Sequence, residues 1–261
     1  MSLCESKSKG IVRYENGIFF RTNDQIATEI HLRIVLQCEV VGTLTCTPSN
    51  LRELAVGYLI TSGMVSAENR LIHLEFVESE SKFDVTLENN NILQQKEYSV
   101  IRPLGCASGD ILFIRGESKK LRMPQTSIKA STIFGLMREF NKSSDLFLAT
   151  GGVHSCALAN EKGILVCHDD IGRHNAVDKV IGALSLQGKK CDGLVLLTTG
   201  RISSEIVLKA INARLSIIVS RSAPTSRGIE LAEKFGLTLV GFARGKKFNV
   251  YCSDEKLIID N

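Results

Sequence analysis

The chain contains 261 residues, enough for one large domain or two modest ones, and its 32 Lys and Arg against 28 Asp and Glu leave a net charge of +4. A hydrophobic content of 44% and a charged content of 23% are ordinary for a soluble globular protein, which excludes a disordered or low-complexity chain. No window approaches the roughly 18 uninterrupted apolar residues of a membrane span, and the first residues lack the apolar stretch of a signal peptide. We therefore expect a cytoplasmic protein that binds neither nucleic acid nor a membrane.

The cysteines follow no pattern typical of a disulfide framework or a zinc site. Their spacing is irregular and no C-x-x-C occurs, so we expect free thiols and no metal. Cysteines inside apolar runs usually serve as small core side chains, and three of them fit that description: Cys38, Cys156 and Cys167.

The first half of the chain predicts an α+β domain. Residues 29–45 are rich in β-branched side chains and fit two strands. A helix is expected from Thr47 as N-cap and Pro48 as first helical residue, through apolar positions spaced three and four apart, to a stop at Gly63. Further strands are expected at 71–78, 82–87 and 96–101.

The second half predicts an α/β domain. A basic polar stretch at 116–124 is the best boundary, which gives domains of residues 1–122 and 123–261. Strands that alternate with helices of ten or more residues indicate a layered sheet with largely parallel pairing. Helices are expected at 130–141, 174–186, 203–213 and 226–235, and strands at 152–159, 163–168, 193–198, 215–219, 237–243 and 247–252.

Four segments of this second domain combine glycines, hydroxyls and basic side chains at the ends of predicted strands: residues 168–178, 198–204, 220–228 and 241–247. Helix N-termini and arginines favour phosphate, so a mononucleotide or dinucleotide-like ligand is expected there. His174 fits an interior histidine beside Asp178 equally well. The residues predicted to contact the ligand are Arg173, His174, Asn175, Arg201, Ser203, Phe242, Ala243, Arg244, Gly245, Lys246 and Lys247.

Other nucleotide chemistries find little support. Neither a Walker loop nor G-x-G-x-x-G is present. The element order is similar to cytidine-deaminase-like folds, but the zinc ligands of those enzymes are missing at both helix starts. A nucleotide-hydrolysing enzyme would need a general base, and the nearest carboxylates, Asp169, Asp170 and Asp178, are better explained as helix-start and surface charges.

Cys106 lies in a segment of small residues, 105–109, between a predicted strand and the apolar run 111–114. Such a thiol should be exposed, and Arg102 could supply the positive charge that favours a thiolate. Cys46, just before a predicted helix, is the second candidate for a reactive thiol, although its flanking strand favours a structural role.

These segments together resemble the formate dehydrogenase accessory sulfurtransferase family (FdhD type). The likeness runs from about residue 25 to 252, and its most specific string is 172–179, Gly-Arg-His-Asn-Ala-Val-Asp-Lys. The other segments that carry it are 45–57, 149–155, 200–205, 222–225 and 241–245.

The resemblance implies a function. Such proteins take sulfur from a cysteine desulfurase as a persulfide and pass it to the bis-molybdopterin guanine dinucleotide cofactor of formate dehydrogenase. They bind the cofactor through its guanine nucleotide ends, form homodimers, and have a second domain of cytidine-deaminase-like fold without metal. The persulfide cysteine maps to Cys106, and the cofactor-binding turn maps to residues 242–247.

One departure from the family pattern leaves an alternative open. Many members carry C-x-x-C on the flexible loop, whereas Gly109 stands three residues after Cys106 here. A single persulfide is chemically sufficient for transfer, so the sequence predicts a sulfurtransferase. The alternative is a binding protein that holds and delivers the molybdenum cofactor without sulfur chemistry.

Overall fold

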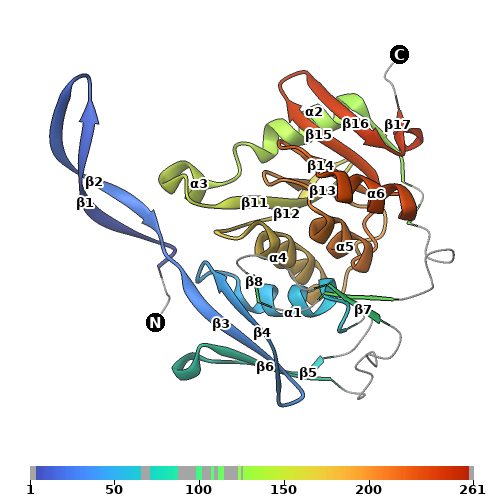
Figure 1. The fold of residues 1–261 in the computed structure, drawn as a ribbon, viewed down its shortest axis with the longest axis horizontal. Coiled ribbons are helices and arrows are strands. Elements are labelled where there is room, and N and C mark those ends of the chain that lie inside the picture. Colours follow the sequence, from blue (N-terminus) through green and yellow to red (C-terminus); the bar gives the residue numbers. More distant parts are fainter. Residues whose placement is uncertain are drawn as a thin grey trace.

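The computed structural model describes residues 4–65, 71–87, 98–101, 107–108, 111–114, 123–124 and 126–258. It contains a larger sheet covered by helices and a smaller sheet covered by a single helix, and a long hairpin extends away from both (Figure 1). The predicted persulfide cysteine, Cys106, lies outside the described residues.

The larger sheet has the strand order β12-β11-β13-β14-β15-β16. Only its centre, β13-β14-β15, is parallel; the outer strands pair antiparallel, so the prediction of largely parallel pairing is correct for the centre alone. The strand bounds are β11 (His154–Asn160), β12 (Gly163–Asp170), β13 (Val195–Thr198), β14 (Ile217–Ser220), β15 (Thr238–Arg244) and β16 (Lys247–Cys252).

Helices cover both faces of this sheet because its strands are apolar on both sides. One face packs on α4 (Arg173–Leu186), α5 (Ser204–Asn212) and α6 (Ser226–Phe235), the other on α2 (Ala130–Phe140). Neighbouring residues of a strand enter different cores: Leu196 faces α4 and α5, whereas Leu197 faces α2. The short pair β10 (Ile128–Lys129) and β17 (Leu257–Ile258) lies beside α2.

The smaller sheet has the order β5-β6-β3-β4-β8 and is covered by α1 (Leu51–Thr61). Its strands are β3 (Ile30–Leu36), β4 (Glu39–Cys46), β5 (Leu71–Val77), β6 (Lys82–Leu87) and β8 (Ala107–Ser108), with β7 (Tyr98–Ile101) and β9 (Ile111–Ile114) as a separate pair. Cys38 is exposed with φ of 70° at the turn between β3 and β4, so its prediction as a core side chain is wrong.

The start of α1 also differs from the prediction. The helix begins at Leu51 after Asn50, whose φ of 51° is left-handed and whose side chain makes no capping bond. Thr47 does not cap it. Its backbone N–H and its hydroxyl both donate to Oδ2 of Asp170 at 3.0 Å, because Asp170 is fully buried and needs donors.

A long hairpin and a short helix were not predicted, nor were the two-residue strands β8, β10 and β17. The hairpin of β1 (Ser6–Glu15) and β2 (Ile18–Ala27) turns at Asn16 and Gly17, both with positive φ, as a two-residue type I′ turn requires. A short helix, α3 (Asp145–Thr150), lies at its base. Within the described ranges, the helices are too short or too polar for any of them to cross a membrane.

Candidate functional site

The site lies where strands of the larger sheet end and helices begin. Loops precede α4, α5 and α6 at this edge, with Gly172, Ser203 and Thr225 as their N-caps. Ile202 N–H donates to the carbonyl of Ala223 at 3.0 Å and thereby ties the second loop to the third. Three helix N-termini are therefore held at one edge, where their free N–H groups favour an anion.

Several polar atoms at this edge are buried without a hydrogen-bond partner among the described residues. Arg173 Nε and Ser203 Oγ are both shielded from solvent and unbonded within the described part of the chain. Gly200 allows the approach of Arg173, since a Cβ there would lie 3.0 Å from Arg173 Cβ. Buried donors are almost always satisfied in folded proteins, so this pair indicates room for a hydrogen-bonding ligand.

His174 contacts a residue that the sequence analysis missed. Its Nε2 lies 2.8 Å from Oε2 of Glu205, in the first turn of α5, and both side chains are mostly buried. The hydrogen bond from His174 lowers the pKa of Glu205. The contact therefore ties the first turn of α4 to the first turn of α5.

His154 is a second residue missed by the sequence analysis. Burial lowers its pKa, and the neighbouring Arg173, His174 and Arg201 lower it further. Three of the residues predicted to contact the ligand, Arg173, His174 and Arg201, are therefore close enough to His154 to influence its imidazole electrostatically. The site is thus strongly electropositive, with His154 itself neutral at pH 7.

A cavity of about 410 Å³ opens beside these residues. Arg221 and Arg244 supply its positive charge, and Arg244 Nε donates to the Arg221 carbonyl at 3.0 Å, which fixes their relative position. The lining residues are Phe147, Gly151, Gly152, Val153, His154, Ile171, Thr199, Arg221 and Arg244. A cavity of this size with convergent cations suits part of a nucleotide.

The predicted turn 242–247 has mixed surroundings. Arg244 lines the cavity, and Gly245 turns the chain with φ of 60°. Ala243 is buried in the core under α2, whereas Phe242, Lys246 and Lys247 are exposed outside the residues that line the cavity.

Asn175 faces the protein interior. Its amide donates to Oδ1 of Asp170 at 2.9 Å and to the carbonyl of Thr45 at 2.8 Å. Lys179 lies 2.8 Å from Oδ2 of the same carboxylate. This buried cluster joins the start of α4 to the end of β4.

The short strand β8, which begins directly after Cys106 in the sequence, is connected to that cluster. Ala107, the next residue, pairs with Leu44 of β4, one residue from Thr45 and its bond to Asn175. Among the described cysteines, burial raises the pKa of Cys46 to about 12 and the pKa of Cys191 to about 12, and it also raises the pKa of Cys156, Cys167 and Cys252. These thiols stay protonated near neutral pH, which makes Cys46 a poor nucleophile.

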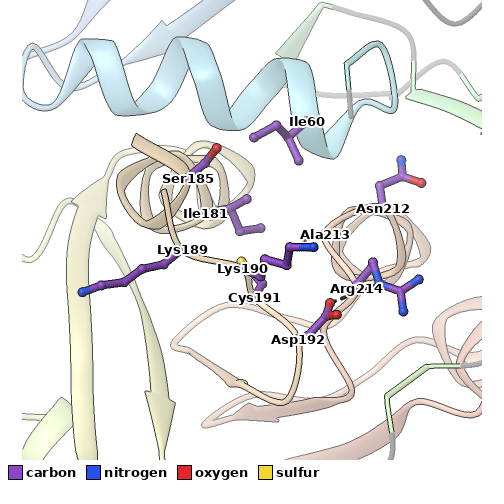
Figure 2. A pocket seen from close by; sticks show the side chains of 10 residues that line it. All are labelled: Ile60, Ile181, Ser185, Lys189, Lys190, Cys191, Asp192, Asn212, Ala213 and Arg214. Carbon is purple, nitrogen blue, oxygen red and sulfur yellow. Dashed lines mark hydrogen bonds and ion pairs between the residues drawn. The ribbon is translucent and has the colours of Figure 1, made fainter. Parts of the chain in front are cut away.

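A second cavity, of about 380 Å³, lies at the other ends of the helices (Figure 2). Its floor includes Ile60 and Ile181, and its basic side chains stand near the C-termini of α4 and α5, where cations are favourable. Arg214 is already paired with Asp192 at 3.1 Å, and Lys189 donates to Gln187. None of the described residues that line this cavity has a buried polar atom without a hydrogen-bond partner.

No group of three or more His, Cys, Asp and Glu side chains suited to a metal occurs within the described ranges.

Comparison with known proteins identifies the relatives of the chain. The model of the FdhD/NarQ family matches residues 27–258. A sulfur carrier protein FdhD from Bacillus licheniformis is 36% identical over 254 residues, covering 96% of both chains. The corresponding protein of Bacillus subtilis is 34% identical, over 95% of this chain and 96% of its own. A crystal structure of a formate dehydrogenase accessory protein from Desulfotalea psychrophila is 28% identical, with a TM-score of 0.80 over 98% of this chain and 100% of that one.

Proposed function

The chain belongs to the FdhD/NarQ family, and from this premise we propose that it is a sulfur carrier for formate dehydrogenase. Cys106 would accept sulfur from a cysteine desulfurase in the cytoplasm. The cation-rich site would hold the bis-molybdopterin guanine dinucleotide cofactor that receives the sulfur, and two copies of the chain would form a homodimer. The observation that carries the acceptor half of this proposal is the pair of buried donors, Arg173 Nε and Ser203 Oγ, which lie at the starts of α4 and α5 without a partner among the described residues.

The residues present fit an anionic cofactor. Arg221 and Arg244 line the cavity, and Arg173 and Arg201 lie near its His154. Guanidinium groups bind phosphate oxygens in a two-pronged geometry, and the helix N-termini add N–H donors. A guanine nucleotide end of the cofactor would therefore place its phosphates here.

The neighbours of Cys106 support its role as carrier. Ala107 is fixed to β4, and β4 is hydrogen bonded to Asn175 at the start of α4, next to Arg173 and His174. Ala107, which follows Cys106 in the sequence, is thus tied through β4 to the start of α4. Five of the seven described cysteines have a raised pKa, which leaves few competitors for the reaction.

The chemistry balances as two sulfane transfers. The Cys106 thiolate attacks the outer sulfur of the desulfurase persulfide; the S–S bond of the donor breaks, a new S–S bond forms, and the desulfurase leaves as a thiolate. In the second step the Cys106 S–S bond breaks and the thiolate of Cys106 is regenerated. The sulfur delivered is formally neutral, so the reduced metal of the acceptor supplies the two electrons that convert it to sulfide.

Intact mass spectrometry tests the first step. The full chain is incubated with a cysteine desulfurase and cysteine, beside Cys106→Ala and a control, Cys38→Ala, which removes an exposed thiol at a turn. We expect one adduct of about 32 Da on the wild type and the control, and none on Cys106→Ala. An adduct that survives in Cys106→Ala would move the chemistry to another thiol, and the exposed Cys4 and Cys38 would be the first to examine.

The alternative is a cofactor-binding protein without sulfur chemistry, which the single cysteine of the 105–109 segment favours. The two functions differ in activation of formate dehydrogenase. A protein that only binds and delivers the cofactor keeps full activation of formate dehydrogenase when Cys106 is replaced by alanine. A sulfur carrier loses this activation but still binds guanine nucleotide.

A further inference from the structure

The hairpin of β1 and β2 exposes an apolar surface at its tip. Tyr14 and Phe19 are paired across the strands with ring centroids 4.9 Å apart, and they are 62% and 75% exposed. Val12 is exposed on the same face, and Ile18 and Phe20 project from the opposite face, since neighbouring residues of a strand alternate. Figure 1 shows the hairpin extending away from the rest of the molecule.

A hairpin of this kind is incomplete by itself. Two strands without further cover are marginally stable in water, and a segment that lies on its own molecule needs only one apolar face. Apolar side chains on both faces of the tip are instead expected of a segment that enters another surface. The strands contribute ten residues each, close to the roughly 20–30 residues per side of a standard protein interface.

The base of the hairpin offers a matching surface on the same chain. There α3 contacts β2, and its Phe147 and Leu148 are 39% and 70% exposed. A strand of ten residues spans about 33 Å, which separates this apolar base from the apolar tip. Two hairpins that run antiparallel about a twofold axis therefore bring the tip of each to the base of the other, as an isologous interface requires.

We propose that the hairpin is a dimerisation arm whose tip, formed by Val12, Tyr14 and Phe19, packs on α3 of a second copy of this chain. The surface covered includes Phe147, which also lines the cation-rich cavity. The second copy thus contributes to the border of the candidate site.

The test measures the mass of the full chain in solution by sedimentation equilibrium. We expect twice 28.6 kDa for the wild type. The double variant Tyr14→Ser/Phe19→Ser removes the two aromatic side chains of the tip. The variant Leu148→Ser changes the surface of α3 on which the tip packs and leaves the arm intact. Loss of two central aromatic contacts should raise the dissociation constant about 100-fold or more. Val40→Ser, at the start of β4 and 60% exposed, serves as the control and should leave the dimer unchanged.

This inference rests on one part of the proposed function, the homodimer, and not on the sulfur chemistry. The outcomes of the test therefore separate the two. A wild-type dimer that both variants leave intact overturns the arm and retains the homodimer. A dimer lost in the tip variant but not in Leu148→Ser overturns docking on α3. A monomeric wild type overturns both the arm and the homodimer, even if the tip residues prove to bind the desulfurase instead. The mass adduct on Cys106 is judged independently of all of these.

Discussion

Arg173 is the residue in which position and chemistry agree most closely. It follows the N-cap of α4, crosses close to Gly200, and keeps a buried Nε without a partner among the described residues. A buried donor left unpaired costs free energy that a bound acceptor recovers. Arg173 therefore has more to gain from an anion than the solvated arginines of the surface.

Replacing Arg173 by Gln should weaken binding of guanosine diphosphate. Hydrogen bonds to charged groups contribute about 1.5–3 kcal/mol, which corresponds to roughly 10- to 100-fold in affinity. Isothermal titration calorimetry on the full chain measures this directly. The matched control is Arg214→Gln in the second cavity, where the guanidinium already pairs with Asp192; equal affinity in both variants would contradict the assignment of the site.

The sequence predicted His174 as a functional residue but not its partner. The interpretation as an interior histidine relied on Asp178, which instead binds Lys209 with Nζ–Oδ1 and Nζ–Oδ2 distances of 2.8 and 2.9 Å. Glu205 lies 31 residues further along the chain from His174 and on another helix. Sequence spacing within one helix cannot reveal a contact between two helices, so only the carboxylate in the first turn of α5 offered a signal.

Packing of α1 against α4 joins the two sheets at the level of helices. The backbones approach at Gly57 and Gly182, where a Cβ would collide with the carbonyl oxygens of Asp178 and Glu53. Below them Thr61 donates to Asp178 at 2.6 Å, and Lys209 binds both residues. Small residues and a satisfied buried ion pair together allow this close approach.

Gly57→Ala should therefore destabilise the fold by about 3 kcal/mol or more, because neither backbone can withdraw without disturbing the buried ion pair. The control is Gly135→Ala on the exposed side of α2, where a Cβ meets nothing within 4 Å. Alanine in a helix is about 0.5–1 kcal/mol more favourable than glycine, so this variant should be more stable than the wild type. Urea denaturation of both gives the comparison, and a neutral Gly57→Ala would refute the close approach.

Elements of the second half of the chain could be predicted because helices of ten or more residues and apolar strands have strong periodicity. The helix predicted at 226–235 is observed as α6 with the same bounds. The hairpin before residue 27 gives no such signal. Its exposed apolar residues fall on both faces, so they do not mark one buried side. The six residues of α3 are likewise too few to show a helical period. The antiparallel outer strands depend on tertiary pairing, which local pattern does not encode.

At the scale of the whole molecule, the buried carboxylate of Asp170 links the segment after Cys106 to the anion site. It accepts hydrogen bonds from Thr47, in the loop between β4 and α1, and from Gly172 and Asn175 at the start of α4. Lys179, also fully buried, balances its charge. One side chain thus sets the position of the β4 end relative to Arg173.

Asp170→Asn should destabilise the chain strongly, because it leaves the buried Lys179 without a counter-charge, at a cost of about 3–5 kcal/mol. Adding Lys179→Met removes that charge and should recover part of the loss, while Gly172 and Asn175 remain without their carboxylate. The folded double variant should still take up sulfur on Cys106 yet bind guanosine diphosphate more weakly and activate formate dehydrogenase less. Thermal melting, the mass adduct and calorimetry measure these three properties on the same sample.

The control is Asp192→Asn/Arg214→Gln, which removes an exposed ion pair worth less than about 1 kcal/mol and should change none of them. If the Asp170→Asn/Lys179→Met protein instead bound the nucleotide as tightly as the wild type, Asp170 would support the fold without positioning the site. The cluster would then stabilise the contact between the end of β4 and the start of α4 without influencing how the nucleotide binds.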